Sequence, residues 1–183
     1  MTGLDQTEVL LAQVEHALAQ QQPLAIVGGN SKHFYGYTTK GQTLSVSQHT
    51  GILHYHPDEL VITARAGTLL SDISQALAEH KQMLAFEPPS FSPAATLGGT
   101  IACGFSGPRR LFSGSARDFV LGCKLINGNA QVVKFGGEVM KNVAGFDVSR
   151  LMVGAMGTLG VLLELSLKVL PLPETTVTHC LNA

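Results

Sequence analysis

The residues best suited to chemistry in this sequence are the glycines and small hydroxyl side chains of one short stretch. It reads Thr96-Leu97-Gly98-Gly99-Thr100-Ile101-Ala102-Cys103-Gly104-Phe105-Ser106-Gly107. Glycine is costly to order, so such a cluster indicates a backbone that takes positive φ or approaches another group closely. Successive free N–H groups beside a helix start form a concave anion site, and phosphate is its usual occupant. The alternative is an ordinary glycine-rich surface loop.

Two further glycine clusters lie beside predicted strands. Gly28-Gly29-Asn30-Ser31-Lys32-His33 follows the short apolar strand expected at Leu24–Val27, and it offers amides, a hydroxyl group and one ammonium to a phosphate. The motif is neither GxGxxG nor GxxxxGK[ST], so it supports neither a dinucleotide-binding Rossmann fold nor a P-loop. The third cluster occupies residues 154–160, ahead of a strand expected at 161–170. Three such clusters indicate an elongated ligand such as a dinucleotide.

The composition narrows the class of protein. The chain has 183 residues, of which 45% are hydrophobic and 14% charged, and its formal net charge is −1. These values are typical of one folded domain or two small ones. No run rich in Lys and Arg is present, so neither nucleic acid nor an anionic membrane is an expected partner. The three cysteines are widely spaced, which fits reduced thiols better than disulfides or a zinc site.

The helices expected to position the turns follow from apolar spacing. A first helix is expected to begin at a capping pair, Asp5 and Glu8, to end before Pro23 and to bury Leu10, Val14, Ala17 and Leu18. Thr68 is expected to cap a second helix, which buries Leu70, Ile73 and Leu77. A short third helix, entered from residues 141–147, is expected to carry Leu151 and Met152.

The strands complete an α+β pattern. Besides those already named, strands are expected at 44–47, 60–66 and 83–86. Asn127-Gly128-Asn129 predicts a hairpin between strands 119–126 and 130–135, because Asn-Gly tolerates positive φ. No apolar run approaches membrane-spanning length and no signal sequence is visible, which predicts a cytoplasmic protein.

Two groups of charged or titratable residues are further candidates. Arg109, Arg110 and Arg117 form the densest positive charge in the chain, and they suit either an anionic ligand or partner, or a solvated surface. His54 and His56 lie at period two, on one face of an extended segment. No carboxylate or cysteine at useful spacing joins them, so a solvated strand face is preferred and no metal site is predicted.

The order of the glycine clusters resembles the FAD-binding domain of the vanillyl-alcohol oxidase/p-cresol methylhydroxylase (PCMH-type) family. The resemblance rests on the first turn, on 96–102 and on Gly157-Thr158-Leu159-Gly160-Val161. Within that family, Ser106-Gly107-Pro108-Arg109-Arg110, residues 117–122 and residues 135–147 look like the E subunits of bacterial glycolate oxidases. The similarity covers roughly residues 20–173.

This resemblance implies a fold and a cofactor site. It implies two α+β subdomains, 1–57 and 58–173, with non-covalent FAD between them. Family members usually continue into a substrate-capping domain, and this chain is expected to depart from them, with a tail at 174–183 and the capping domain absent. The first turn and 96–100 would hold the pyrophosphate, Gly160 and Val161 the adenine end, and Ser106 and Gly107 would lie toward the flavin. The implied cofactor-binding residues are Gly28, Gly29, Asn30, Ser31, Lys32, Pro88, Thr96, Leu97, Gly98, Gly99, Thr100, Ala102, Ser106, Gly107, Gly157, Gly160 and Val161.

The resemblance also implies an activity. Family members oxidise an α-hydroxy acid to an α-keto acid while the flavin accepts a hydride, and a glycolate oxidase-like complex adds partner subunits. Attachment to the inner membrane through such partners stays open. No catalytic base can be named, and Asn30 stands where many relatives have a third glycine. The alternative is a non-catalytic module that carries FAD and docks to a partner subunit. A nicotinamide-binding Rossmann domain is disfavoured by the Asn-Gly hairpin and the missing fingerprint.

Overall fold

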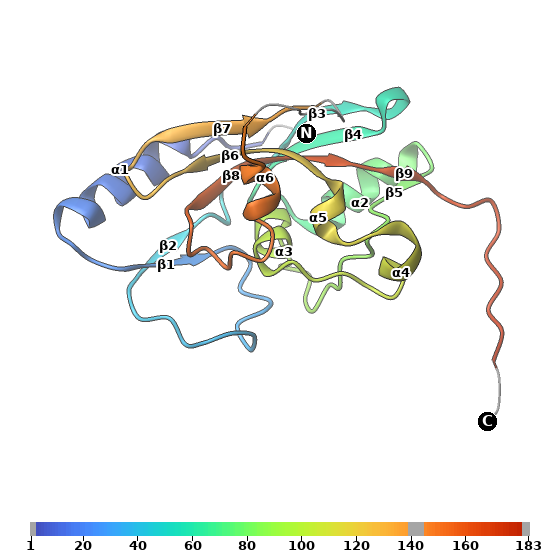
Figure 1. Cartoon of the computed structure of the whole chain (residues 1–183), viewed down its shortest axis with the longest axis horizontal. Helices are drawn as coiled ribbons and strands as arrows, with labels where there is room; N and C mark the ends of the chain where they lie inside the picture. The colour runs from blue at the N-terminus through green and yellow to red at the C-terminus, as the bar shows by residue number, and fades with distance from the viewer. Residues whose placement is uncertain (1–2, 139–144, 181–183) are drawn as a thin grey trace.

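The centre of the protein is a five-stranded antiparallel sheet. The computed structural model describes residues 3–138 and 145–180. The strand order is β3-β4-β8-β6-β7, and these strands run across the upper half of the molecule in Figure 1. Their bounds are β3 Ile52–His56, β4 Val61–Arg65, β6 Val120–Ile126, β7 Val132–Gly136 and β8 Val161–Lys168.

Two small sheets flank the large one. β1 (Leu24–Val27) and β2 (Gln42–Ser45) are paired in parallel, and β5 (Gln82–Met83) and β9 (Leu170–Pro171) are antiparallel. Parallel strands require a long crossover, so the chain between β1 and β2 runs as an extended loop that begins at the first glycine turn. The mixture of sheets and helices confirms the predicted α+β class.

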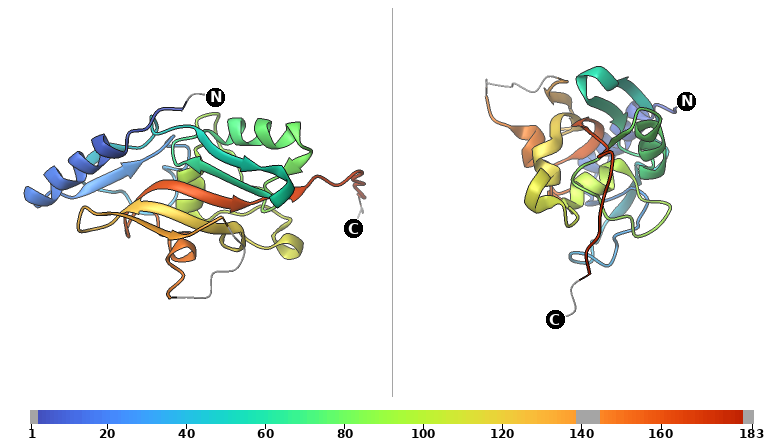
Figure 2. Two further views of the ribbon diagram at one scale, coloured as in Figure 1. Left: turned by 90° about the horizontal axis from the view of Figure 1, so that it is seen from above. Right: turned by 90° about the vertical axis from the view of Figure 1, so that its right-hand side faces the viewer.

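The helices that pack on the large sheet, α1, α2, α3 and α5, contact the face that carries Val161, Leu163, Leu165 and Leu167 of β8. α1 and α2 are at opposite ends of the molecule, as Figures 1 and 2 show. The helical segments are α1 Thr7–Ala19, η1 Pro57–Glu59, α2 Leu70–Glu79, α3 Leu97–Cys103, α4 Arg110–Ser113, α5 Ala116–Phe119 and α6 Val148–Leu151. None of those described has the length and hydropathy needed to cross a bilayer.

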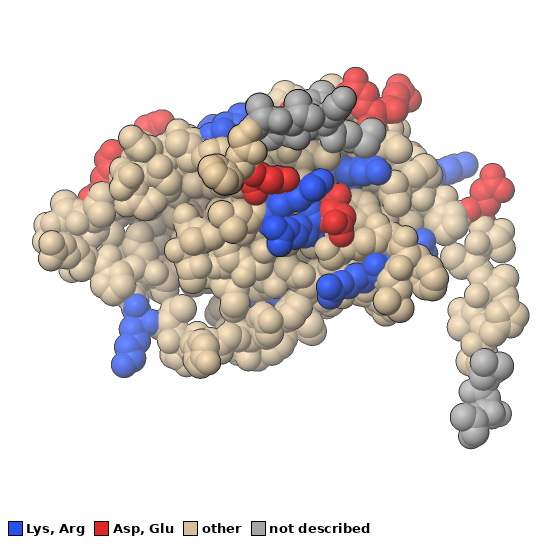
Figure 3. Space-filling model, in the orientation of Figure 1, with Lys and Arg blue, Asp and Glu red and all other residues tan. Residues whose placement is uncertain are grey.

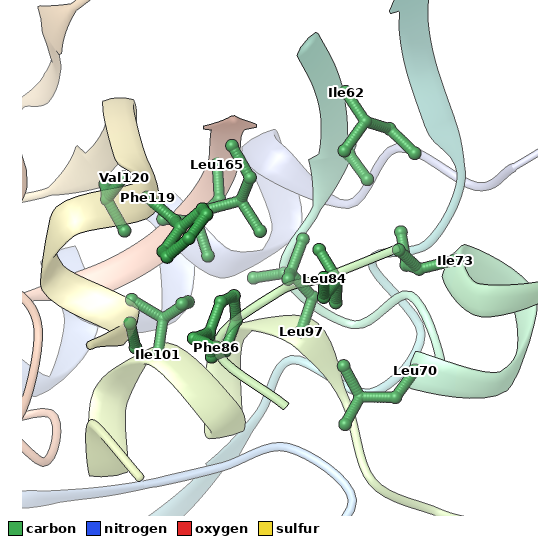
Figure 4. Packing of buried hydrophobic residues seen from close by; sticks show 14 of the residues in the cluster. Ile62, Leu70, Ile73, Leu84, Phe86, Leu97, Ile101, Phe119, Val120 and Leu165 are labelled. Carbon is green, nitrogen blue, oxygen red and sulfur yellow. The ribbon is translucent and has the colours of Figure 1, made fainter. Parts of the chain in front are cut away.

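Two hydrophobic cores hold these layers together. The larger lies between the sheet and α2, α3 and α5, where Phe86, Leu97, Ile101, Phe119 and Leu165 converge (Figure 4). The smaller lies under α1, whose buried residues face β2 and the ends of β6 and β8. Because α3 is anchored in the large core by Leu97 and Ile101, its glycines are fixed in position against the neighbouring chain.

Several local predictions need correction. Leu18 is 53% exposed rather than buried. Asp5 accepts the Thr7 N–H at 2.9 Å but does not occupy the N-cap of α1, which is Gln6. The Thr68 hydroxyl accepts from the Gly51 N–H at 2.9 Å and does not cap α2, because the first N–H of α2 donates instead to the Ala95 carbonyl. At α2 a tertiary contact has replaced the expected local cap, whereas the first N–H of α1 keeps a local acceptor in Asp5.

Other boundaries also differ from the sequence prediction. The strand expected at 83–86 ends at Met83, since the chain turns there and places Phe86 in the core. α6 ends at Leu151, so Met152, which was expected within this helix, is its C-cap. The segment 141–144, expected to lead into α6, lies outside the described residues.

The predicted division of the chain falls between two paired strands. β3 precedes the boundary at 57/58 and pairs with β4 across it. The subdomains 1–57 and 58–173 therefore stay a prediction, as does the tail, whose described residues 174–180 form neither helix nor strand.

Candidate cofactor site

A cavity of about 500 Å³ opens between the β1–β2 pair and the large sheet. Its walls are the loop after β1, the glycine face of α3 and the loop that precedes β8. The structure therefore brings parts of all three predicted glycine clusters together. The predicted site residues that line it are Gly28, Gly29, Asn30, Ser31, Lys32, Thr96, Gly98, Gly99, Ala102, Gly157 and Gly160.

The first glycine turn presents free amides to this cavity. The parallel ladder ends where the Val46 N–H donates to the Val27 carbonyl at 2.8 Å. From Gly28 to Ser31 the backbone N–H groups donate to no other residue that the structure describes. A Cβ at Gly29 would collide with the Ala94 carbonyl, so glycine is required there. Unpaired amides in a turn form a concave anion site.

Lys32 places one buried positive charge beside those amides. Its side chain is 8% exposed, and Nζ lies 3.4 Å from the Thr100 hydroxyl and 6.0 Å from the centroid of the Phe91 ring. No carboxylate within the described residues forms an ion pair with it. Burial lowers the pKa of Lys32, while nearby Cys103 acts in the opposite direction. A buried ammonium without an anion is unfavourable, so the site is complementary to an anionic ligand.

The start of α3 offers no such free amides, which corrects the sequence prediction. Leu97 N–H donates to the Thr68 carbonyl at 2.9 Å, and Gly98 N–H to the Ala66 carbonyl at 2.7 Å. Gly99 N–H donates to Thr96 Oγ1 at 3.3 Å. This stretch contributes small side chains to the cavity wall and a buried threonine hydroxyl behind Lys32.

The loop before β8 completes the wall of the cavity. The Gly154 N–H donates to the Ile101 carbonyl at 3.0 Å, and the Met156 N–H to the Ala102 carbonyl at 2.9 Å. These bonds attach the loop to the end of α3. Gly157, with φ +78°, then passes close to Ile26 of β1. The loop therefore fixes the width of the cavity between β1 and α3.

Six of the predicted residues do not line the cavity: Pro88, Leu97, Thr100, Ser106, Gly107 and Val161. Leu97 and Val161 are core residues. Ser106 Oγ accepts the Ala116 N–H at 2.9 Å, and Gly107 lies so close to Glu87 that a Cβ would stand 2.7 Å from the Glu87 Cβ. These contacts give both residues a structural role, and their contact with a cofactor stays a prediction.

The three arginines also lie outside the cavity wall. Arg109 pairs with Glu87, through Nε at 3.2 Å and through its backbone N–H at 2.9 Å. Arg110 and Arg117 are exposed. Figure 3 shows basic and acidic side chains gathered over α5 and α6 in the middle of an otherwise mostly uncharged face. There, hydrogen bonds from Ser115 hold the pKa of Asp118 below its usual value. This surface is a mixed charge network rather than a concentrated cationic site.

His54 and His56 are parallel, as the strand period predicts. Their ring centroids are 6.3 Å apart and the rings are inclined by 7°. In the described part of the chain no group of three or more His, Cys, Asp or Glu residues is placed to hold a metal. Both side chains are exposed on β3, an edge strand of the large sheet.

The loop after the first glycine turn also lines the cavity, and most of it was not predicted as part of the site. Tyr35, Tyr37, Thr38 and Thr39 line the cavity together with His33 of the first glycine cluster. Contacts between Tyr35 and Phe105, at 4.5 Å between ring centroids, hold this loop against the end of α3. The available signal was the run of aromatic and hydroxyl residues at 33–39. The position of this run at the cavity can be recognised only once β1 and β2 are known to be parallel neighbours.

Comparison with known proteins identifies the class to which this site belongs. The model of a family described as an FAD binding domain matches residues 4–136. The chain belongs to this FAD-binding family, and FAD is its cofactor. Among solved structures, alkyldihydroxyacetonephosphate synthase matches with a TM-score of 0.71 and 21% identity, over 92% of this chain and 31% of that one. The likeness confirms the predicted fold.

Relatives of known name are more similar in sequence. Glycolate oxidase subunit GlcE of Escherichia coli is 56% identical over 94% of this chain and 49% of its own length. Glycolate oxidase subunit GlcD of Bacillus subtilis is 35% identical over 76% of this chain, and D-lactate dehydrogenase of Anaerostipes hadrus 34% over 75%. They are covered over 30% and 28% of their lengths, so the chain spans half or less of these relatives.

Proposed function

We propose that this chain is the FAD-binding part of a glycolate oxidase-like flavoprotein, which oxidises an α-hydroxy acid to an α-keto acid. The observation that carries the proposal is Lys32, a buried ammonium without an anionic partner among the described residues, beside the free amides of the first glycine turn. Amides and a cation together suit a diphosphate. Similarity to glycolate oxidase and D-lactate dehydrogenase supports the reaction class and a complex with partner subunits.

In this proposal each wall of the cavity has its own part. The first turn and Lys32 bind the pyrophosphate, while Gly99, Ala102 and Gly157 leave room for the elongated ligand. Bound flavin supplies a hydride acceptor. The protein's task is then to orient the cofactor and to leave one end accessible to substrate. Location in the cytoplasm, with attachment to the inner membrane through partners as a further alternative, belongs to the same proposal.

An alternative function is a module that carries FAD without oxidising a substrate by itself. Oxidation of a hydroxy acid needs cations for its carboxylate and a base for its hydroxyl proton. In the described residues, the cavity wall contains no Asp or Glu, and Lys32 is its single Lys or Arg. This observation favours a chain that depends on other parts of the assembly for substrate binding.

The test is a visible spectrum of the purified chain, followed by acid precipitation. Flavin absorbance in the protein and free FAD in the supernatant are expected, since non-covalent binding is proposed. Flavin that stays with the precipitate, and is lost from His33→Ala, would contradict non-covalent binding. Colourless protein that takes up no added FAD would contradict the function itself.

A second measurement separates the two functions. Anaerobic addition of glycolate or D-lactate is expected to leave the flavin of the isolated chain oxidised, and turnover should need the remainder of the assembly. Rapid bleaching by glycolate would show that the chain contains its own base, and the carrier function would then be wrong.

A further inference from the structure

His49 is a fully buried titratable residue outside the cofactor cavity, where the chain passes from the β1–β2 pair to the large sheet. It is 0% exposed and lies in the connection between β2 and β3. Its backbone N–H donates to the Val46 carbonyl at 3.0 Å, and its carbonyl accepts the Gly67 N–H at 2.9 Å. The backbone of His49 therefore connects the segment that follows β2 with the segment that follows β4.

The imidazole of His49 holds the beginning of α1. Nδ1 accepts the backbone N–H of Gln6, the N-cap residue of α1, at 3.0 Å. Because Nδ1 is an acceptor, the neutral ring carries its hydrogen on Nε2, which has no partner within the described residues. Burial lowers the pKa of His49, which favours the neutral ring.

Charged groups from three elements surround this ring. Arg65, at the end of β4, donates to Asp5 Oδ2 at 3.0 Å and to the Thr50 carbonyl at 3.1 Å. The other oxygen of Asp5 accepts the Thr7 N–H and lies 3.7 Å from His49 Nδ1. Glu164 of β8 is the third charge near the ring, and it is paired with Lys124 at 3.0 Å. We call Asp5, Gln6, His49 and Arg65 the N-terminal latch.

The latch fixes a helix that supports one wall of the cavity. Leu10 and Val14 of α1 are buried in the smaller core together with Val46, and Ile26 packs against the same core. Val46 and Ile26 also line the cavity. On the opposite wall, Ala66 directly follows the latch residue Arg65. Movement of α1 would therefore change the support of the β1–β2 wall relative to the large sheet.

We propose that the N-terminal latch holds these two walls together only while His49 is neutral, so that proton uptake by His49 releases α1 and weakens FAD binding. The inference rests on the proposed function, because it takes the cavity as the FAD site. In the protonated ring both nitrogens carry hydrogen, so Nδ1–H would face the Gln6 N–H across 3.0 Å and their bond would be lost. The new charge would also lie beside Arg65, while the Asp5 carboxylate is already shared with Arg65 and Thr7.

The sign of the pH dependence follows from the burial of the ring. The latched form binds a proton less tightly than an exposed histidine does, so the released form is favoured as the pH falls below about 6.5. One proton coupled to release changes the equilibrium by at most about tenfold per pH unit. FAD affinity falls measurably once the free energy gained by proton uptake equals the free energy that stabilises the latched form.

The test measures the FAD dissociation constant of the full chain between about pH 7.5 and about pH 5 at constant ionic strength. For the natural sequence we expect a rise of about fivefold or more. His49→Asn keeps an acceptor near the Nδ1 position but takes up no proton, so its affinity should stay flat. His33→Asn is the matched control, because His33 lines the cavity, and it should keep the natural slope. A slope that persists in His49→Asn, or that disappears in His33→Asn, overturns the proposal.

A second readout needs no cofactor. Hydrogen exchange of α1 amides, corrected for the intrinsic pH dependence of exchange, should show loss of protection at the acidic end in the natural sequence and not in His49→Asn. A natural chain that binds no FAD at neutral pH contradicts the proposed function, whereas unchanged α1 protection at both pH values contradicts the latch. This second result applies even if the His49 variant does not fold.

Discussion

The first glycine turn and the start of α3 face the same cavity, but their amide groups do different things. From Gly28 to Ser31 the N–H groups have no acceptor within the described residues. At the start of α3, the N–H groups of Leu97, Gly98 and Gly99 donate to carbonyls of the preceding chain or to the Thr96 hydroxyl. One turn retains its capacity to bind an anion, and the other has used it to attach a helix.

Similar glycine clusters therefore serve different structural roles: some glycines allow close packing of the chain, and others leave space in the cavity. A Cβ at Gly98 would stand 2.7 Å from the Ala66 Cβ, so this glycine allows two parts of the protein to approach each other. Gly99, one residue later, meets only the Thr96 hydroxyl at 3.1 Å and otherwise faces the cavity. Gly98 therefore serves chain packing, whereas Gly99 is a residue of the proposed cofactor site, and substitutions can test each separately.

The largest effect is expected for Lys32→Met, which removes the charge but keeps most of the stem. FAD affinity should fall by about 30-fold or more, because loss of one member of a buried charge pair costs about 2–5 kcal/mol. The FAD-free protein should melt at the same or a higher temperature, since an unpaired buried ammonium is removed. Calorimetric titration with FAD and thermal melts without it measure the two effects.

The control for that variant is Lys40→Met, in the same loop. Lys40 is exposed, so neither affinity nor melting temperature should change measurably. Equal losses of affinity in both variants would show that the cavity responds to the general charge of the loop. Binding of the anion by the first glycine turn and Lys32 in particular would then be wrong.

The next largest effects are expected for Gly98→Ala, on folding stability, and for Gly99→Val, on FAD affinity. The first should destabilise the FAD-free protein by about 1–3 kcal/mol, since it overpacks the contact with Ala66. The second should leave the FAD-free protein folded but lower FAD affinity by about tenfold or more, or about 1.4 kcal/mol. Thermal melts with and without FAD separate the effects, because a ligand bound only to the folded state raises its stability. Full flavin content in Gly99→Val would contradict its placement at the cofactor.

Periodicity predicted most of the fold. The alternation and apolar runs of β1, β4, β6, β7 and β8 were correctly recognised, as was the hairpin at Asn127-Gly128. Errors arose where distant backbone replaced a local signal. Thr68 has the residue type of a helix cap, but its hydroxyl is bonded to Gly51, and the Ala95 carbonyl receives the first N–H of α2. Such contacts cannot be read from spacing along the chain.

The sequence predicted that the three glycine clusters contact one ligand, but not the hydrogen bonding of their amides. The three clusters do line one cavity, yet their residue types do not reveal which amides are already bonded. Lys32 was identified as one of several phosphate ligands, whereas its burial without an ion-pair partner among the described residues became visible only in three dimensions. Tyr35, Tyr37, Thr38 and Thr39 were not predicted as site residues, because their role depends on the parallel pairing of β1 with β2.

A smaller effect is expected for Thr96→Val, which removes the hydroxyl that caps α3. Loss of the bond from the Gly99 N–H should cost about 1 kcal/mol of folding stability. Thr96→Ser retains the hydroxyl and should recover most of that loss. Denaturant unfolding of both variants without FAD gives the comparison. If Thr96→Val instead kept its stability and lost FAD affinity as Lys32→Met does, the hydroxyl would act on the ligand rather than on the helix.

The smallest effect is expected for the double variant Arg110→Met/Arg117→Met. Both side chains are exposed and neither lines the cavity, so solvent and salt screen their charges from an anion bound there. FAD affinity should stay within about twofold and folding stability within about 0.5 kcal/mol. Arg109→Met differs in a useful way, because it breaks the pair with Glu87 and should lower the melting temperature without changing FAD affinity. A large loss of FAD affinity in the double variant would mean that the cofactor extends beyond the cavity to these arginines, and Lys32 would then share the phosphate with them.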